Sequence, residues 1–151
     1  DEARGNLENK GSVIQRQLFN KLRLPYTNVV FEDLMSKDSL EMTKEDRRLI
    51  CQAVEKRQEK KQASLILHGT DTMLKSACYC LDHIKKLTAP VIFTGAMRPL
   101  GFSDSDAWQN VVEALLLARI APIGVHISFH SCLFDPRKAR KNIAKATFEA
   151  I

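Results

Sequence analysis

Three short, almost uninterrupted apolar runs constrain the fold of this chain more than any other feature of its sequence. They are ASLIL at 63–67, PVIFT at 90–94 and IGVHISF at 123–129. Such runs are typical of strands that are covered on both faces, as in a parallel sheet. Between them, apolar residues at helical spacing predict helices over 73–86 and 106–119, with Ser105 as a cap of the second. The alternation favours an α/β fold with a mostly parallel sheet and helices on both faces.

The first third of the chain carries the same alternation. Apolar spacing predicts a helix over 12–22, and the β-rich run TNVVFEDL at 27–34 predicts a strand. The helix predicted over 43–59 has the clearest start, because Thr43 is a good N-cap and two acidic residues follow in the first turn. At the other end, we expect the tail from residue 135 to be a turn followed by a short helical or irregular segment.

The composition is that of an ordinary globular protein, with 44% hydrophobic and 27% charged residues. No apolar stretch approaches the ~20 residues that span a bilayer, and no signal peptide is visible after Asp1. We therefore expect a cytoplasmic protein with no membrane partner. The sequence shows no repeat, low-complexity stretch or linker, which predicts one domain over residues 1–151.

Charge and cysteine content limit the ligands that the chain is expected to bind. The net charge is +5, and five basic residues gather near the end: Arg137, Lys138, Arg140, Lys141 and Lys145. No aromatic residue lies among them and no nucleic-acid motif accompanies them, which favours a solvated or interface helix face and makes nucleic-acid binding the weaker alternative. The spacing of the four cysteines fits neither a disulfide nor a zinc site, so we expect no metal and interpret them as buried free thiols in a reducing compartment.

Polar and small residues directly follow three of the predicted strands. They are KDSLEM at 37–42, HGTDT at 68–72 and GAMRP at 95–99. In an open parallel sheet, ligands bind beyond the carboxyl ends of the strands. Gly69 allows a tight turn, and the Thr70 hydroxyl and Asp71 carboxylate then project from a helix start, where they can activate a nucleophile or a water. Local pattern alone favours the simpler alternative, in which Thr70, Asp71 and Thr72 merely cap the helix.

Four motifs of the chain together resemble those of the L-asparaginase family. KDSLEMTKED, HGTDTM, VIFTGAMRP and SDSDAWQN occur in family order and with family-like spacing, over about residues 36–110. The length resembles that of small single-domain members. The resemblance implies the fold of the N-terminal domain of L-asparaginases. It also implies hydrolysis of L-asparagine to L-aspartate and ammonia by a threonine nucleophile, no metal or organic cofactor, and assembly as a homo-oligomer.

The resemblance implies a role for each residue that matches a family position. Thr70 matches the second catalytic threonine, which helps to activate the nucleophile or the attacking water. Asp71 matches the carboxylate that works with this threonine and holds the α-ammonium group of the substrate. Ser39 matches the serine that contacts the substrate's α-carboxylate. The backbone at Gly69 and Ala96 matches positions that approach the ligand, Ala96 being near the amide that is cleaved.

Two parts of the family pattern are not found where they are expected. The first catalytic threonine of the family lies in a T-G-G-T-I segment, which these 151 residues do not contain, and we expect it upstream of Asp1. The family lysine that pairs with the aspartate is expected on the helix after SDSDAWQN. No lysine occurs between Lys86 and Lys138, and Arg119 is the nearest cation on that helix. A non-catalytic, amino-acid-binding module of the same fold therefore stays the alternative to an enzyme.

Overall fold

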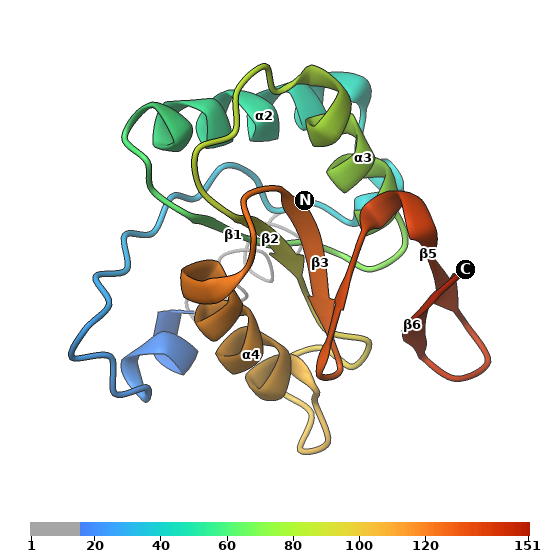
Figure 1. Cartoon of the computed structure of the whole chain (residues 1–151). Coiled ribbons are helices and arrows are strands. Elements are labelled where there is room, and N and C mark those ends of the chain that lie inside the picture. The colour runs from blue at the N-terminus through green and yellow to red at the C-terminus, as the bar shows by residue number, and fades with distance from the viewer. Residues whose placement is uncertain (1–15) are drawn as a thin grey trace, which may run out of the picture.

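A four-stranded sheet forms the centre of the computed structural model, which describes residues 16–151 (Figure 1). Strands β1 (Ser64–Leu67), β2 (Val91–Thr94) and β3 (Val125–Phe129) are parallel, and β4 (Cys132–Phe134) is antiparallel to β3. Their order in the sheet is β1-β2-β3-β4. The three apolar runs of the sequence therefore become neighbouring strands, and the prediction of a mostly parallel α/β sheet is confirmed.

Helices cover both faces of this sheet. Helices α2 (Lys44–Glu59) and α3 (Met73–His83) lie together over one face, and α4 (Ala107–Ile120) lies on the other (Figure 1). The start of α2 is the predicted one, because Thr43 Oγ1 accepts from Asp46 N while the Asp46 carboxylate accepts from Thr43 N. In the part of the chain that the structure describes, no helix is both long and apolar enough to cross a membrane.

The core lies mainly between the sheet and the layer formed by α2 and α3. Phe93, Phe129 and Met73 are its largest fully buried side chains. Strand β2 is buried along its whole length, as its continuous apolar run predicts. On the other face, Val111 of α4 packs against a smaller cluster that includes Leu18 and Phe19. The sheet is thus held rigidly from both sides, which fixes the positions of its strand ends.

Two expectations for the first third of the chain change. The strand predicted over 27–34 is not formed, and residues 27–38 run without regular structure. Val30 is 73% exposed and Leu34 40%, and among the described residues no strand pairs with this run, although Val29 packs against the cluster around Leu18 and Phe19. Of the helix predicted over 12–22, residues 16–20 are helical, and its first residues lie outside the described part.

The tail differs more from expectation, because it folds as a β-hairpin. After a 3-10 turn, η2 (Pro136–Lys138), strand β5 (Ala139–Asn142) pairs with β6 (Thr147–Ala150) in a separate two-stranded sheet. Phe148 anchors the hairpin, since it is 3% exposed and its ring lies 4.9 Å from that of Phe129. The basic residues predicted to form a helix face therefore lie on this turn and hairpin instead.

Candidate functional site

Thr70 and Asp71 lie at the carboxyl end of β1, and their side chains meet a lysine from the hairpin. The ammonium group of Lys141 donates to Thr70 Oγ1 at 2.8 Å and to Asp71 Oδ1 at 2.7 Å. The side chain of Lys141 is 21% exposed, whereas that of Asp71 is 47% exposed. A hydroxyl, a carboxylate and an ammonium group thus form one cluster, which reaches solvent on the side of Asp71.

Neither Thr70 nor Asp71 caps the helix that follows. The N-cap of α3 is Thr72, and its side chain makes no capping hydrogen bond. Instead, Thr72 Oγ1 donates to the carbonyl of Ser39 at 2.8 Å. Of the three residues that the simpler alternative assigns to the cap, Thr72 therefore takes the N-cap position, whereas Thr70 and Asp71 bind Lys141.

Ser39 lies directly against Gly69, so the structure brings these two predicted site residues together. It begins the short 3-10 helix η1 (Ser39–Glu41), is 2% exposed, and accepts a hydrogen bond from Thr72 N at 3.3 Å. A Cβ atom at position 69 would lie 2.8 Å from Ser39 Oγ. Only glycine lets the turn before Thr70 approach Ser39 this closely.

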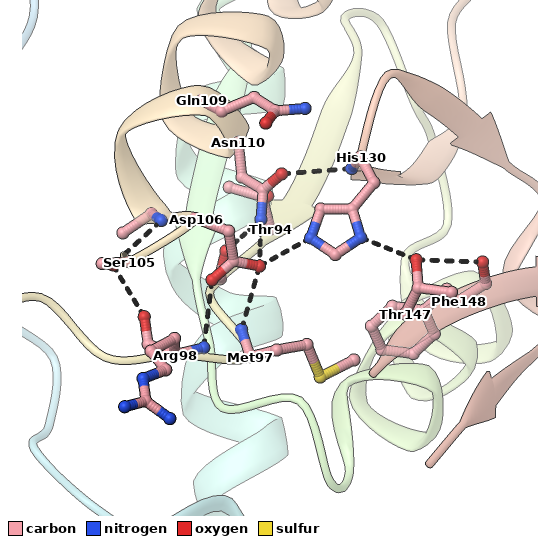
Figure 2. Close-up of polar contacts among 12 residues, drawn as sticks. Thr94, Met97, Arg98, Ser105, Asp106, Gln109, Asn110, His130, Thr147 and Phe148 are labelled. Carbon is pink, nitrogen blue, oxygen red and sulfur yellow. Dashed lines mark hydrogen bonds and ion pairs between the residues drawn. The ribbon is translucent and has the colours of Figure 1, made fainter. Parts of the chain in front are cut away.

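Ala96 lies in the loop after β2, and this loop packs on the turn after β1. A Cβ atom at Gly95 would lie 2.2 Å from the carbonyl oxygen of His68, so the two loops are in direct backbone contact. Helix α4 and its N-cap residue hold the peptide groups on both sides of Ala96: Asn110 Nδ2 donates to Gly95 O at 2.9 Å, and Met97 N donates to Asp106 Oδ2 at 3.2 Å (Figure 2). The backbone at Ala96 is therefore fixed beside the strand end that carries Thr70.

The Asp106 carboxylate receives several donors in addition to Met97 N. Arg98 N donates to Oδ1 at 3.0 Å, and His130 Nε2 lies 2.6 Å from Oδ2 (Figure 2). Burial alone would raise the pKa of Asp106, but the donors outweigh burial and hold that pKa below its ordinary value. Asp106 is therefore an ionised anchor for the loop that contains Ala96.

A buried chain of hydrogen bonds supports the carbonyl group of Gly69. His68 Nδ1 lies 2.7 Å from Gly69 O, and its Nε2 lies 2.8 Å from Ser76 Oγ, which accepts from Arg47 Nε at 3.0 Å. Since a carbonyl only accepts, Nδ1 carries the proton and the Ser76 hydroxyl donates to Nε2. Burial is the main cause that lowers the pKa of His68, and the positive charge of Arg47 lowers this pKa further. The hydrogen bond to Gly69 O acts in the opposite direction and raises it. His68 is thus a neutral support for the peptide before Thr70.

Lys141 is the residue of this cluster that sequence reasoning missed. Arg119, the nearest cation on the expected helix, donates to Thr27 Oγ1 at 3.3 Å instead. The sequence offers one weak signal: Ala139 and Lys141 are two apart in a short strand, so they share the face that turns toward the domain. Ala139 is buried and Lys141 is largely covered on that face.

The thiols and carboxylates show no arrangement for a metal. Between residues 16 and 151, no group of three or more His, Cys, Asp or Glu side chains is placed to share an ion. All four cysteines are free. Cys51 and Cys80 are buried with their sulfur atoms 3.1 Å apart, but Cys132 is exposed, so the expectation of buried thiols is wrong for that residue.

Comparison with known proteins identifies one family, whose relatives also include a 60 kDa lysophospholipase of Mus musculus, 33% identical over 112 residues that are 74% of this chain and 19% of that protein. Residues 2–151 match the family described as "Asparaginase, N-terminal". L-asparaginase 1 of Escherichia coli strain K12 is 33% identical over 135 residues, which are 85% of this chain and 39% of that protein. The L-asparaginase of Dirofilaria immitis is 30% identical over 123 residues, which are 81% of this chain and 20% of that protein.

A solved structure agrees with these sequence matches. The thermostable L-asparaginase from Thermococcus kodakarensis superposes with a TM-score of 0.82 at 27% identity, over 89% of this chain and 42% of that one. The chain thus spans about two fifths of the length of these bacterial and archaeal asparaginases. The family match over almost the whole sequence, together with the shared fold, shows that this chain belongs to the asparaginase family.

Proposed function

We propose that this chain builds the amide-hydrolysing site of an L-asparaginase-type amidohydrolase, which converts L-asparagine and water into L-aspartate and ammonia. The observation that carries the proposal is the contact of one ammonium group, that of Lys141, with both Thr70 Oγ1 and Asp71 Oδ1. Membership of the asparaginase family supports the same class of reaction. Within that class, the cluster explains how a hydroxyl at a strand end becomes reactive.

The cluster has the parts that hydroxyl chemistry at an amide needs. An ammonium group that donates to a hydroxyl oxygen stabilises the negative charge that develops there as its proton leaves. Asp71 balances the charge of Lys141. In a two-step acyl transfer, a threonine attacks the amide carbon, the C–N bond breaks with release of ammonia, and water then frees aspartate. Thr70 serves this sequence by activating the nucleophile or the attacking water.

The surrounding groups fit the two charged ends of an amino acid. The half-exposed carboxylate of Asp71 binds Lys141 through Oδ1, and we assign its Oδ2 to the α-ammonium group of the substrate. Ser39, which packs against Gly69, is assigned to the α-carboxylate. The backbone at Ala96 then faces the side-chain amide. Glutamine is one methylene longer, a difference that pocket size discriminates by only ~1–3 kcal/mol.

The test is ammonia release by the full-length protein, compared with its Thr70→Ala variant. We expect the wild type to hydrolyse asparagine and the variant to lose ~10²–10⁴-fold in kcat, as when an acid–base group is removed. Thr27→Ala is a matched control, because the Thr27 hydroxyl accepts from Arg119 of α4, outside the cluster around Lys141. Absence of ammonia from the wild type, with no effect of Thr70→Ala, would refute the proposal.

The alternative function is binding of an amino acid without chemistry. It is favoured by the lack of a T-G-G-T-I segment within the 151 residues. Ammonia release from L-asparagine, measured beside calorimetric binding of L-aspartate, separates the two functions, because both would bind the amino acid but a binding module would release no ammonia. Finding T-G-G-T immediately upstream in the reading frame would remove the observation that supports this alternative.

We also infer that the protein assembles as a homo-oligomer through α4. Four large apolar side chains recur every fourth residue on its exposed face: Trp108, Val112, Leu116 and Ile120. A contiguous exposed stripe of this kind marks an interaction surface. Light scattering tests the inference, and a fully active monomer would contradict it.

Nucleic acid is a weaker partner for the basic residues of the tail. Three of the five are already paired with carboxylates, Arg137 with Asp82, Arg140 with Glu149 and Lys141 with Asp71. The charge of these three residues is therefore largely balanced within the chain.

A cytoplasmic location stays a prediction from the sequence.

A further inference from the structure

A polar network lies behind the site and joins two parts of it that are far apart in sequence. Figure 2 shows His130 between Asp106 and Thr147. Its Nε2 lies 2.6 Å from Asp106 Oδ2, and its Nδ1 lies 2.7 Å from Thr147 Oγ1. The backbone N–H of His130 also donates to Asn110 Oδ1 at 3.1 Å. One imidazole thus spans from the start of α4 to strand β6.

On one side, the network ends at the loop that contains Ala96. Asp106 binds the N–H groups of Met97 and Arg98, and Asn110 binds the carbonyl of Gly95. Both residues that hold this loop are themselves contacted by His130. A shift of the imidazole is therefore transmitted through Asp106 to the N–H groups of Met97 and Arg98, and a shift of the His130 backbone is transmitted through Asn110 to the carbonyl of Gly95.

On the other side, the network ends at the hairpin that carries Lys141. Thr147 pairs with Asn142 across the hairpin, and Lys141 directly precedes Asn142 in β5. Phe148 packs its ring against Phe129 in the core and so holds the hairpin against the sheet. The hydrogen bond between Thr147 and His130 ties the hairpin to the turn that also contacts Asp106 and Asn110 at the start of α4.

The backbone of His130 forms the tight turn between β3 and β4 together with Ser131. Its φ is +45° and that of Ser131 is +64°, as a two-residue hairpin turn requires at both of its central residues. This conformation, in the turn between β3 and β4, aims the ring at Asp106 and Thr147 together.

We propose that His130 is a positioning residue that couples the Ala96 loop to the Lys141 hairpin, so that the amide-binding and proton-handling parts of the site keep one relative position. The catalytic consequence rests on the proposed function, but the coupling itself does not. Coupling differs from a merely structural role in one measurable way. A substitution in the hairpin should change the dynamics of the Ala96 loop, which Asp106 holds on the other side of His130.

The test is amide hydrogen exchange of the folded full-length protein, with two variants that break the network at different points. His130→Asn keeps a side chain that tolerates positive φ but is too short to reach both partners. Thr147→Val keeps the shape of the side chain and removes the hydroxyl group that bonds His130. We expect each variant to raise exchange about tenfold at the amides of Arg140 and Asn142, as for the loss of one hydrogen bond.

The decisive measurement is amide exchange in the loop that contains Ala96. Thr147→Val should also raise exchange at Met97 and Arg98, and the double variant should add little to either single change, because one link is broken in all three. His126→Asn is the matched control, since His126 lies on β3, just before this turn, and bonds the Pro122 carbonyl instead. We expect this control to leave both segments at wild-type rates.

Kinetics of asparagine hydrolysis then test the positioning role. Both network variants should lower kcat more than they raise KM, because Ser39 and Asp71 remain in place to bind the substrate. Exchange confined to the hairpin in Thr147→Val, or unchanged kcat in both variants, would overturn the proposal. A wild-type protein without asparagine turnover would overturn the proposed function, and the exchange result would still decide the coupling.

Discussion

Replacement of Lys141 by methionine separates the stability of the domain from its chemistry. Methionine keeps most of the length of the side chain and its apolar stem but removes the ammonium group. The substitution therefore abolishes the hydrogen bonds to Thr70 Oγ1 at 2.8 Å and to Asp71 Oδ1 at 2.7 Å. These two bonds tie the hairpin to the turn after β1.

The expected effect on stability is small. The two ionic side chains are 21% and 47% exposed, so water already screens their attraction. Ion pairs of this kind contribute about 0–1 kcal/mol to the free energy of unfolding. In a domain of this size, 1 kcal/mol moves Tm by about 2–4 °C. The hairpin also keeps its Phe148 anchor.

The expected effect on the reaction is much larger. Without the ammonium group, negative charge on the Thr70 oxygen loses its stabilising partner as the proton leaves. The loss in kcat should be ~10²–10⁴-fold. At about 1.4 kcal/mol for each factor of ten, this is roughly 3–5 kcal/mol of transition-state stabilisation. The effect on the rate therefore exceeds the effect on folding severalfold.

The assay combines ammonia release with urea unfolding of the same preparations. Lys145→Met is the matched control, because Lys145 is exposed in the turn of the same hairpin. This control should keep wild-type kcat and wild-type stability. If Lys141→Met kept wild-type kcat, or lost activity only in proportion to unfolding, the assignment of Lys141 to the reaction would be refuted.

Two further substitutions test the backbone contacts around the site. Gly95→Ala should lower the free energy of unfolding, measured in urea, by at least about 3 kcal/mol, because the new Cβ would lie 2.2 Å from the carbonyl oxygen of His68. The control Gly101→Ala has open space around it and should lose only ~1–2 kcal/mol from backbone strain at positive φ. Equal losses in the two variants would contradict this account. Since the pKa of folded His68 lies below the unfolded value of ~6.5, the unfolded chain binds the proton more tightly, and stability should fall as pH drops below that value. Arg47→Met removes one cause of the lowered pKa, so histidine-ring NMR should show a higher titration midpoint, and an unchanged midpoint would count against the role of Arg47.

The sheet was the most predictable part of the molecule. Continuous apolar runs at 63–67, 90–94 and 123–129 correspond to three parallel strands, although the last begins two residues later, after Gly124 with φ +156°. Thr43 marks the start of α2 because capping chemistry is local. The placement of Thr70 and Asp71 at a strand end followed from topology, since carboxyl ends of parallel strands share one edge.

The elements that were missed depend on distant contacts. TNVVFEDL at 27–34 has the residues of a strand but lies exposed without a partner strand. The opposite error occurred in the tail, where Ala139–Asn142 contains Arg, Lys and Asn, which local preference does not assign to a strand. This strand exists because Phe148, on its partner, is buried against Phe129. Lys141 was missed for the same reason.

The 71 positions that separate Lys141 from Thr70 have a consequence for biosynthesis. Strands β1, β2 and β3 can associate as soon as residue 129 has left the ribosome, because their pairings need nothing from the hairpin. The ammonium group reaches the threonine only after β6 has emerged and closed on β5. A nascent chain therefore passes through an interval in which its three parallel strands can pair, while Phe148 and Lys141 have not yet reached their contacts with Phe129 and Thr70.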